Sequence, residues 1–222
     1  MDKSYGKVIE YVKNGITDGE IKAGDKLPPE RDMAAELKIS RNSAREGLRI
    51  LENMGVLESR QGAGNYVSGS FDDIVAEMLS FMYILKQLDV DKITEFRSTL
   101  ELGALDISVP RASKEQKEQM LTYLERLEAA ETEGERVSWD KAIHYLLIEA
   151  TGNLCMTVTY KALDKIMDEY IPKMRSKIIE GMHSEQYLSR AHRTLAEGFA
   201  EGSVDKARKG LELHFKYIHQ YM

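Results

Sequence analysis

The sequence predicts a mainly α-helical protein, with a small N-terminal domain that also contains a β-hairpin and a C-terminal all-α antiparallel helical bundle. Three observations lead to this fold class. Residues 1–69 hold three short amphipathic segments, then two short alternating segments around a glycine-rich turn. From residue 71 onward the apolar residues recur only at helical spacing. The breaks between these later segments are short, which favours an antiparallel bundle, so we expect two domains, 1–69 and 70–222.

The N-terminal domain is expected to contain three helices followed by the hairpin. In chain order the elements are helices at about 3–18, a short one that begins with Pro29, and 41–53, then strands at 56–60 and 65–67. Pro29 suits the first turn of the second helix, and Ser40 suits the N-cap of the third. Gly55 suits the left-handed residue that stops the third helix. A turn at 61–64 and a linker at 68–70 complete the domain.

The C-terminal domain is expected to contain seven helices. Their approximate bounds are 72–88, 91–109, 113–133, 138–151, 154–181, 184–201 and 203–221. The breaks between them are expected at Asp89, Pro110, Gly134, Gly152, Asn153, Gly181 and Gly202. In the first of these helices, the stretch that holds Met82, Tyr83 and Leu85 is interpreted as core or as dimer surface.

The charge is distributed unevenly along the chain. The net charge is −6, from 31 Lys and Arg against 37 Asp and Glu, but residues 1–69 hold 11 of each and are neutral overall. The acidity therefore belongs to the C-terminal domain. Within the N-terminal domain the arginines gather locally, and local clustering matters more than overall charge for contacts with phosphate.

Composition also limits the compartment. No apolar run approaches the length of a membrane helix, and the first residues do not resemble a secretory signal. The single cysteine, Cys155, excludes an internal disulfide and fits a reducing cytoplasm. Because Leu154 and Met156 flank it, we expect Cys155 to be buried. We expect a cytoplasmic protein with no membrane partner.

A helix pair followed by a hairpin is the arrangement of a winged helix-turn-helix. In such domains the second helix of the pair enters the major groove of DNA. Arg41 and Arg45 share one face of that helix, and arginine can bridge guanine O6 and N7, while Asn42 can pair with adenine. Gly62 and Gly64 would let the backbone of the wing approach DNA closely. The alternative is that the arginines form a solvated helix face.

Four side chains of the C-terminal domain are candidate metal ligands. Asp140 and His144 lie one turn apart on one predicted helix, and His192 and His214 lie on two others. One carboxylate and three imidazoles suit a divalent ion such as Zn²⁺, Ni²⁺, Mn²⁺ or Fe²⁺. From spacing alone, an ordinary core or surface role is the better interpretation for any single histidine, and a metal site for the set is no better supported than its absence.

The N-terminal sequence resembles a known family. The run IKAGDKLPPERDMAAELKISRNSAREGLRILENMGVLESRQGAGNYV, within residues 5–67, is similar to the DNA-binding domain of the GntR family of bacterial repressors. The resemblance implies main DNA contacts by three arginines and further contacts by four other residues. These are Arg31, Arg41 and Arg45, then Ser40, Asn42, Gln61 and Gly62. Pro29 and Gly47 depart from the pattern, where a small capping residue and an alanine are commoner.

Residues 74–218 resemble the all-helical FCD domain of the FadR subfamily. The likeness rests on residues dispersed over the domain, which are Phe96, Arg97, Glu101, Asp140, Ile143, His144, Gly152, Asn153, His192, Arg193 and His214. It implies one metal ion held by the aspartate and three histidines named above. It also implies that Arg97 pairs with the carboxylate of an effector. The alternative for Arg97 is an ion pair with Glu101 along one helix.

These features together predict a dimeric DNA-binding regulator, a repressor released from palindromic operator DNA by a small organic acid. A second hypothesis is a metalloenzyme whose Asp/His₃ centre activates water or oxygen. The chain shows no evident nucleophile or acid–base pair beyond the ligands, so we do not expect an enzyme. A third hypothesis is a regulator whose metal is purely structural.

Overall fold

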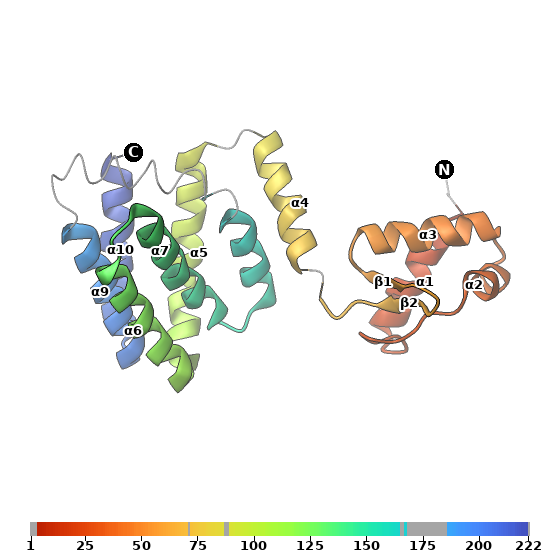
Figure 1. Ribbon diagram of the computed structural model, residues 1–222, viewed down its shortest axis with the longest axis horizontal. Helices are drawn as coiled ribbons and strands as arrows, with labels where there is room; N and C mark the ends of the chain where they lie inside the picture. Colours follow the sequence, from red (N-terminus) through yellow and green to blue (C-terminus); the bar gives the residue numbers. More distant parts are fainter. Residues whose placement is uncertain (1–3, 71, 87–88, 165–166, 168–185, 222) are drawn as a thin grey trace. The chain divides into compact units, whose positions relative to one another are not determined.

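The computed structural model describes residues 4–70, 72–86, 89–164, 167 and 186–221 (Figure 1). The chain divides into two compact units, residues 1–75 and 76–222. Helices dominate both units, and the described strands form one two-stranded antiparallel sheet in the first. The predicted mainly α-helical fold class is therefore confirmed. Among the described residues, no helix combines the length and apolar character needed to cross a bilayer.

The N-terminal unit is a three-helix domain with a hairpin. Its elements are α1 (Gly6–Thr17), α2 (Glu30–Glu36), α3 (Arg41–Asn53), β1 (Leu57–Arg60) and β2 (Gly64–Val67). Helices α1 and α2 both pack against α3, and a single cluster of apolar side chains joins them to the hairpin. That core contains Val8, Val12, Leu27, Met33, Ala34, Ala44, Leu48, Leu51, Leu57 and Val67.

The predicted ends of α3 are confirmed. The hydroxyl of Ser40 accepts a hydrogen bond from the backbone N–H of Ser43 at 3.0 Å, as an N-cap does. Gly55 follows the helix with φ 73°, in the left-handed region that favours glycine. Pro29 differs from expectation, because it is the N-cap of α2 and not part of its first turn. Its ψ of 149° is extended, so the helix begins only at Glu30.

Gly47, the other departure from the family pattern, has a structural reason. A Cβ at this position would lie 2.6 Å from Cβ of Val8 and 2.9 Å from the carbonyl oxygen of Tyr5. Helix α1 therefore packs directly onto the backbone of α3 at Gly47, and the lower helix propensity of glycine is offset by this close approach.

The C-terminal unit is a helical bundle. Its described helices are α4 (Asp72–Leu85), which begins within the first unit, α5 (Val90–Arg111), α6 (Lys114–Ala129), α7 (Glu133–Glu149), a segment at 154–164, α9 (Gln186–Glu201) and α10 (Val204–Tyr221). Helix α5 packs against α7 and α10, and α6 packs against α7 and α9 (Figure 1). Their apolar faces form one continuous core.

Two expected helix breaks are wrong. Pro110 lies inside the last turn of α5, where its missing N–H removes only one hydrogen bond before the helix ends at Arg111. Gly134 lies in the first turn of α7, which begins five residues earlier than the expected 138. The side chains of Thr132 and Glu135 form a capping box there, and this favourable start outweighs the cost of the glycine. The break at Gly181 and most of the helix predicted after residue 164 lie outside the described residues.

Cys155 is exposed, which corrects the expectation that it is buried. The side chain of Asn153 accepts hydrogen bonds from the backbone N–H groups of Cys155 and Met156, so a helical segment begins here. Cys155 therefore lies in the first turn, outside the core, and its apolar sequence neighbours do not decide its burial.

Helices α9 and α10 approach each other unusually closely. A Cβ on Gly198 of α9 would collide with the backbone of Ala207, and one on Gly210 of α10 would collide with the backbone of Leu195. The two glycines therefore let the helix backbones touch. His192 precedes Gly198 on α9 and His214 follows Gly210 on α10, each by one helical turn or more.

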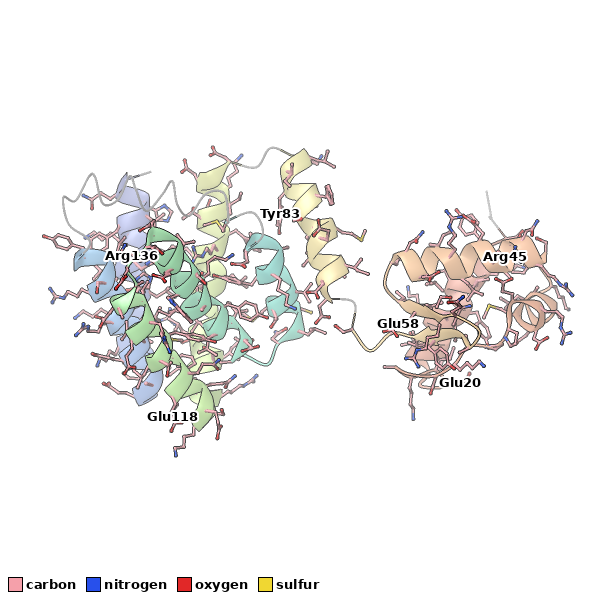
Figure 2. The ribbon with its side chains drawn as sticks, in the orientation of Figure 1. Glu20, Arg45, Glu58, Tyr83, Glu118 and Arg136 are labelled. Carbon is pink, nitrogen blue, oxygen red and sulfur yellow. The ribbon has the colours of Figure 1, made fainter. Side chains whose placement is uncertain are left out.

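Helix α4 has a different character from the others. Ala76 and Ser80 are buried, and Tyr83 packs against the core of the bundle (Figure 2). Met78, Phe81 and Leu85, which follow one another at helical spacing, are 60%, 57% and 80% exposed. The stretch that we interpreted as core or dimer surface is thus divided, with Tyr83 against the core and a set of large apolar side chains toward solvent.

Candidate nucleic-acid interface and metal centre

The seven residues that the sequence assigns to DNA contact are all exposed. They come from α2, from the cap and first turns of α3, and from the turn between β1 and β2, and they are Arg31, Ser40, Arg41, Asn42, Arg45, Gln61 and Gly62. Figure 2 labels Arg45 in the N-terminal half of α3, the part of a recognition helix that reads base edges. Their contacts with DNA stay predictions.

Arg45 is paired with the preceding helix. Its Nε donates to both carboxylate oxygens of Glu30, at 3.1 and 3.3 Å. The Arg45 side chain is exposed and that of Glu30 is half-buried at the surface, so the pair contributes at most about 1 kcal/mol. The two terminal nitrogens of Arg45 take no part in this pair. The sequence did not indicate the contact, because it joins residues 15 positions apart.

The wing is held by its own side chains. The guanidinium of Arg60 lies 4.2 Å from the centre of the Tyr66 ring and also pairs with Glu58 at 3.3 Å. Gly62 has φ 73°, and no atom lies within 4 Å of the place where its Cβ would be. Glycine is therefore needed here for the turn of the backbone, and the space beside it is open.

The structure brings together the four candidate metal ligands. Asp140 and His144 come from α7, His192 from α9 and His214 from α10, and their ligand atoms all lie within 4.8 Å of one another. All four are buried, with 0% to 4% of each residue exposed. Donor atoms on one zinc ion, at about 2.1 Å from it, lie about 3.0 to 4.2 Å apart. A slight closing of the cluster would therefore suit one ion.

The hydrogen-bonding groups of the cluster also fit an ion. Among the described residues, Nε2 of His144 and both ring nitrogens of His192 and His214 have no hydrogen-bond partner. Such groups are costly to bury without a partner. Nε2 of His192 lies 2.9 Å from Oδ1 of Asp140 but without the geometry of a hydrogen bond. That distance is close to the one between neighbouring ligands on one ion, so we conclude that the residues present fit a divalent metal.

Burial and neighbouring charges keep two of the candidate ligands, Asp140 and His214, in the forms that bind metal. Burial, with the nearby His144 and His192, lowers the pKa of His214 well below its usual range, so its ring is neutral. Burial alone would raise the pKa of Asp140, but His192 and His144 outweigh it and hold that pKa well below the ordinary value. A neutral imidazole and an ionised carboxylate are the forms that coordinate metals.

Beside the cluster lies a second buried group of polar side chains. Nε of Arg97 donates to Oε1 of Glu101 at 2.6 Å, and the hydroxyl of Tyr160 donates to the same oxygen at 3.0 Å. The ion pair that we considered for Arg97 is therefore present. Burial opposes the charged form of Arg97, but Tyr160 and Glu101 outweigh it and raise its pKa above the ordinary value. Nη2 of Arg97 is buried and has no partner among the described residues.

Glu101 also reaches the metal cluster, which the sequence did not predict. Its Oε2 is hydrogen-bonded to Nδ1 of His144. The two residues are 43 positions apart on α5 and α7, so only the packing of these helices brings them together. The sequence did indicate the other partner of Glu101, because Arg97 lies four residues earlier on the same helix.

The fold and the buried cluster define a class of protein. A winged helix-turn-helix unit followed by a helical unit with an internal ligand site is the arrangement of a transcriptional regulator that responds to a metabolite. Residues 4–67 match the family model "Bacterial regulatory proteins, gntR family", and residues 92–217 match the FCD domain model. The chain belongs to the GntR family of bacterial regulatory proteins, with an FCD domain as its second part.

Curated relatives agree with this family. The chain is 26% identical over 205 residues to the HTH-type transcriptional regulator LutR of Bacillus subtilis, covering 91% of this chain and 94% of LutR. It is 27% identical over 221 residues to the putative L-lactate dehydrogenase operon regulatory protein of Escherichia coli, covering 97% and 85% of the two chains. These relatives are transcriptional regulators, so the metalloenzyme hypothesis is set aside and the chain is not an enzyme.

A solved structure supports the fold. The GntR protein of Streptococcus agalactiae superposes with a TM-score of 0.65 at 21% identity, and the match covers 98% of this chain and 100% of that one. At this identity the likeness concerns the fold alone.

Proposed function

We propose that the chain is a dimeric repressor that a small organic acid, bound beside a divalent metal ion, releases from palindromic operator DNA. The observation that carries the proposal is the buried cluster of Asp140, His144, His192 and His214. We assign DNA binding to residues 1–69 and sensing and dimerisation to residues 70–222, with the latter of the FadR type. A bacterial regulator of this kind works in the cytoplasm, where its DNA is.

The DNA-reading surface consists of the seven exposed residues of the N-terminal unit named above. Arg41 and Arg45 read base edges in the major groove, and Arg31 anchors the helix pair to the phosphate backbone. Gln61 and Gly62 place the wing against the neighbouring groove or backbone. The exposure of all these residues supports the proposal.

The metal is held by Asp140, His144, His192 and His214, and its candidates are Zn²⁺, Ni²⁺, Mn²⁺ and Fe²⁺. When bound, the ion supplies open coordination positions that a carboxylate can occupy. Arg97 is the second anchor for the acid. Its Nη2 is buried without a partner among the described residues, and its guanidinium carbon lies 5.6 Å from the centre of the Phe215 ring, next to His214 in sequence. A carboxylate there would complete the hydrogen bonds of the guanidinium.

The dimer proposal rests on specificity and on α4. One winged helix-turn-helix covers few base pairs, and two of them related by a two-fold axis read a palindrome. GntR regulators commonly act as dimers. The exposed Met78, Phe81 and Leu85 of α4 form an apolar stripe of the kind that marks protein–protein contacts, and a second copy of this chain is its proposed occupant.

Release follows from thermodynamic linkage. The acid binds more tightly to one arrangement of the two DNA-binding units than to the other, and so it lowers the population that fits the operator. By the same linkage, operator DNA lowers the affinity for the acid by an equal factor. The alternative is that the metal only stabilises the bundle and that no acid acts through it.

Operator binding measured by fluorescence anisotropy tests the function. The probe is the DNA upstream of the chain's own gene, at one fixed salt concentration and with zinc-loaded protein. Since one relative is named for an L-lactate dehydrogenase operon, L-lactate is the first acid to test, and lactamide, which lacks the carboxylate, is the control. We expect L-lactate or a related acid to weaken operator binding at least about tenfold, which is a coupling of about 1.4 kcal/mol.

Two outcomes separate the hypotheses. If a panel of small organic acids leaves operator affinity unchanged, release by an acid is wrong. If an acid binds equally well to chelated and to zinc-loaded protein, the metal is structural and does not take part in sensing.

A further inference from the structure

Glu101 occupies a central position between the two buried polar groups. It lies on α5 with 0% of its surface exposed. Its neighbours come from three different elements: Arg97 from α5 itself, Tyr160 from the helical segment at 154–164, and His144 from α7. It is the residue through which the described hydrogen bonds reach from Arg97 to the metal cluster.

The two oxygens of Glu101 have different partners. Oε1 accepts hydrogen bonds from both Arg97 and Tyr160, at 2.6 and 3.0 Å. Oε2 is left for Nδ1 of His144. A residue that served only to neutralise Arg97 would not need its second oxygen on a histidine of another helix.

We infer that Glu101 is a positioning residue that fixes the tautomer and the orientation of His144 for metal binding. This inference rests on the proposed metal centre. A carboxylate can only accept at Oε2, so the proton of the neutral His144 ring lies on Nδ1. The lone pair then lies on Nε2, the ring nitrogen that has no partner among the described residues and is therefore left to face an ion held by the four candidate ligands.

The inference agrees with the chemistry of histidine ligands. A histidine that binds a metal usually donates its other ring N–H to a carboxylate or carbonyl group, which fixes the ring and makes the coordinating nitrogen more basic. His144 has such a partner. Among the described residues, neither His192 nor His214 has a hydrogen bond to either ring nitrogen. Among the three histidines, His144 is therefore the one whose ring orientation is set by a hydrogen bond before the ion arrives.

The variant that tests this role is Glu101→Gln. The donors of Arg97 and Tyr160 hold the amide oxygen, so the amide NH₂ must face Nδ1 of His144. That nitrogen then has to accept, and the proton moves to Nε2, the atom that the ion needs. Removing a carboxylate partner of this kind typically costs 10- to 100-fold in metal affinity. Glu101→Asp keeps the carboxylate and should restore part of the affinity.

A matched control removes the same charge elsewhere in the bundle. Glu128 of α6 pairs with Arg193 of α9 at 2.7 Å, at the surface of the same unit. Glu128→Gln should bind zinc as the wild type does. Circular dichroism of all variants reports whether the helices are intact.

Two measurements decide the matter. Calorimetric titration of the chelator-stripped full chain with Zn²⁺ gives the affinity, expected to be about 10- to 100-fold weaker in Glu101→Gln. Nitrogen-15 NMR of histidine-labelled, metal-free protein gives the tautomer. The signal of His144, assigned by its loss in His144→Ala, should show the proton on Nδ1 in the wild type and on Nε2 in Glu101→Gln.

The outcomes are distinguishable. If the wild type takes up no zinc, the metal centre and this inference fail together. If it binds zinc and a folded Glu101→Gln binds equally tightly, only the role of Glu101 is wrong. Should Glu101→Gln not fold, the wild-type protein still decides the matter, because a His144 proton found on Nε2 overturns the inference.

Discussion

Removing the metal should lower the melting temperature of the C-terminal unit by a predictable amount. A ligand that binds only the folded state at a free concentration 1,000 times its Kd stabilises it by about 4 kcal/mol. The unit spans residues 76–222. For domains of about 150 residues each kcal/mol corresponds to about 2–4 °C, so saturation with Zn²⁺ should raise the melting temperature by about 8–16 °C. The unpartnered imidazoles make the metal-free state the less stable one.

The assay is calorimetry of the full chain after chelation and at a series of zinc concentrations. The shift should grow with the logarithm of free zinc. His214→Ala should abolish it, whereas His219→Ala, an exposed histidine on the same helix, should leave it unchanged. An identical melting temperature with and without zinc, at all concentrations, would refute a metal site in this cluster. A shift that survives in His214→Ala would place the ion elsewhere.

Three further predictions concern other parts of the molecule. Arg45→Ala should weaken operator binding by about 1–3 kcal/mol, or about 5- to 150-fold, because a base contact is lost. The control is Lys13→Ala, which removes the same charge from α1. If fluorescence anisotropy at fixed salt shows equal losses of affinity in the two variants, the assignment of Arg45 to a base contact is wrong. Because burial holds the pKa of His214 well below the ordinary 6.5, only the unfolded state takes up a proton at this residue near pH 6. The free energy of unfolding of the metal-free protein, measured in urea, should therefore fall as the pH drops below about 6.5. If this free energy falls equally steeply with pH in His214→Ala, His214 is not the cause. Phe81→Glu should shift the protein from dimer to monomer in sedimentation, since it puts a charge into the exposed apolar stripe of α4. A dimer of unchanged affinity would show that the stripe is not the interface.

The predicted elements succeed where local chemistry dominates. Ser40 and Gly55 delimit α3 as expected, because cap and stop signals act within one turn of the chain. The expected breaks at Pro110 and Gly134 fail for the same local reason. Each residue costs little when it lies in the last or first turn, and the capping box at Thr132 outweighs the glycine.

The candidate site divides in a similar way. The four candidate metal ligands were recognisable from residue type together with the family likeness, and the structure places their ligand atoms within 4.8 Å of one another. Partners that depend on helix packing had no signal in the sequence. The bond between Glu101 and His144 and the pair between Glu30 and Arg45 join different helices, and no local pattern marks either one.

The contact between α9 and α10 determines how much of the proposed metal site is formed by folding alone. Gly198 and Gly210 let the two backbones touch, so the hairpin that carries His192 and His214 can change its spacing only by breaking that packing. The entropy of holding two imidazoles side by side is thus lost during folding and not during coordination. A single methyl group at position 198 or 210 would force the helices apart and separate the histidines. A substitution that touches none of the four candidate ligands would in this way disrupt the proposed metal site.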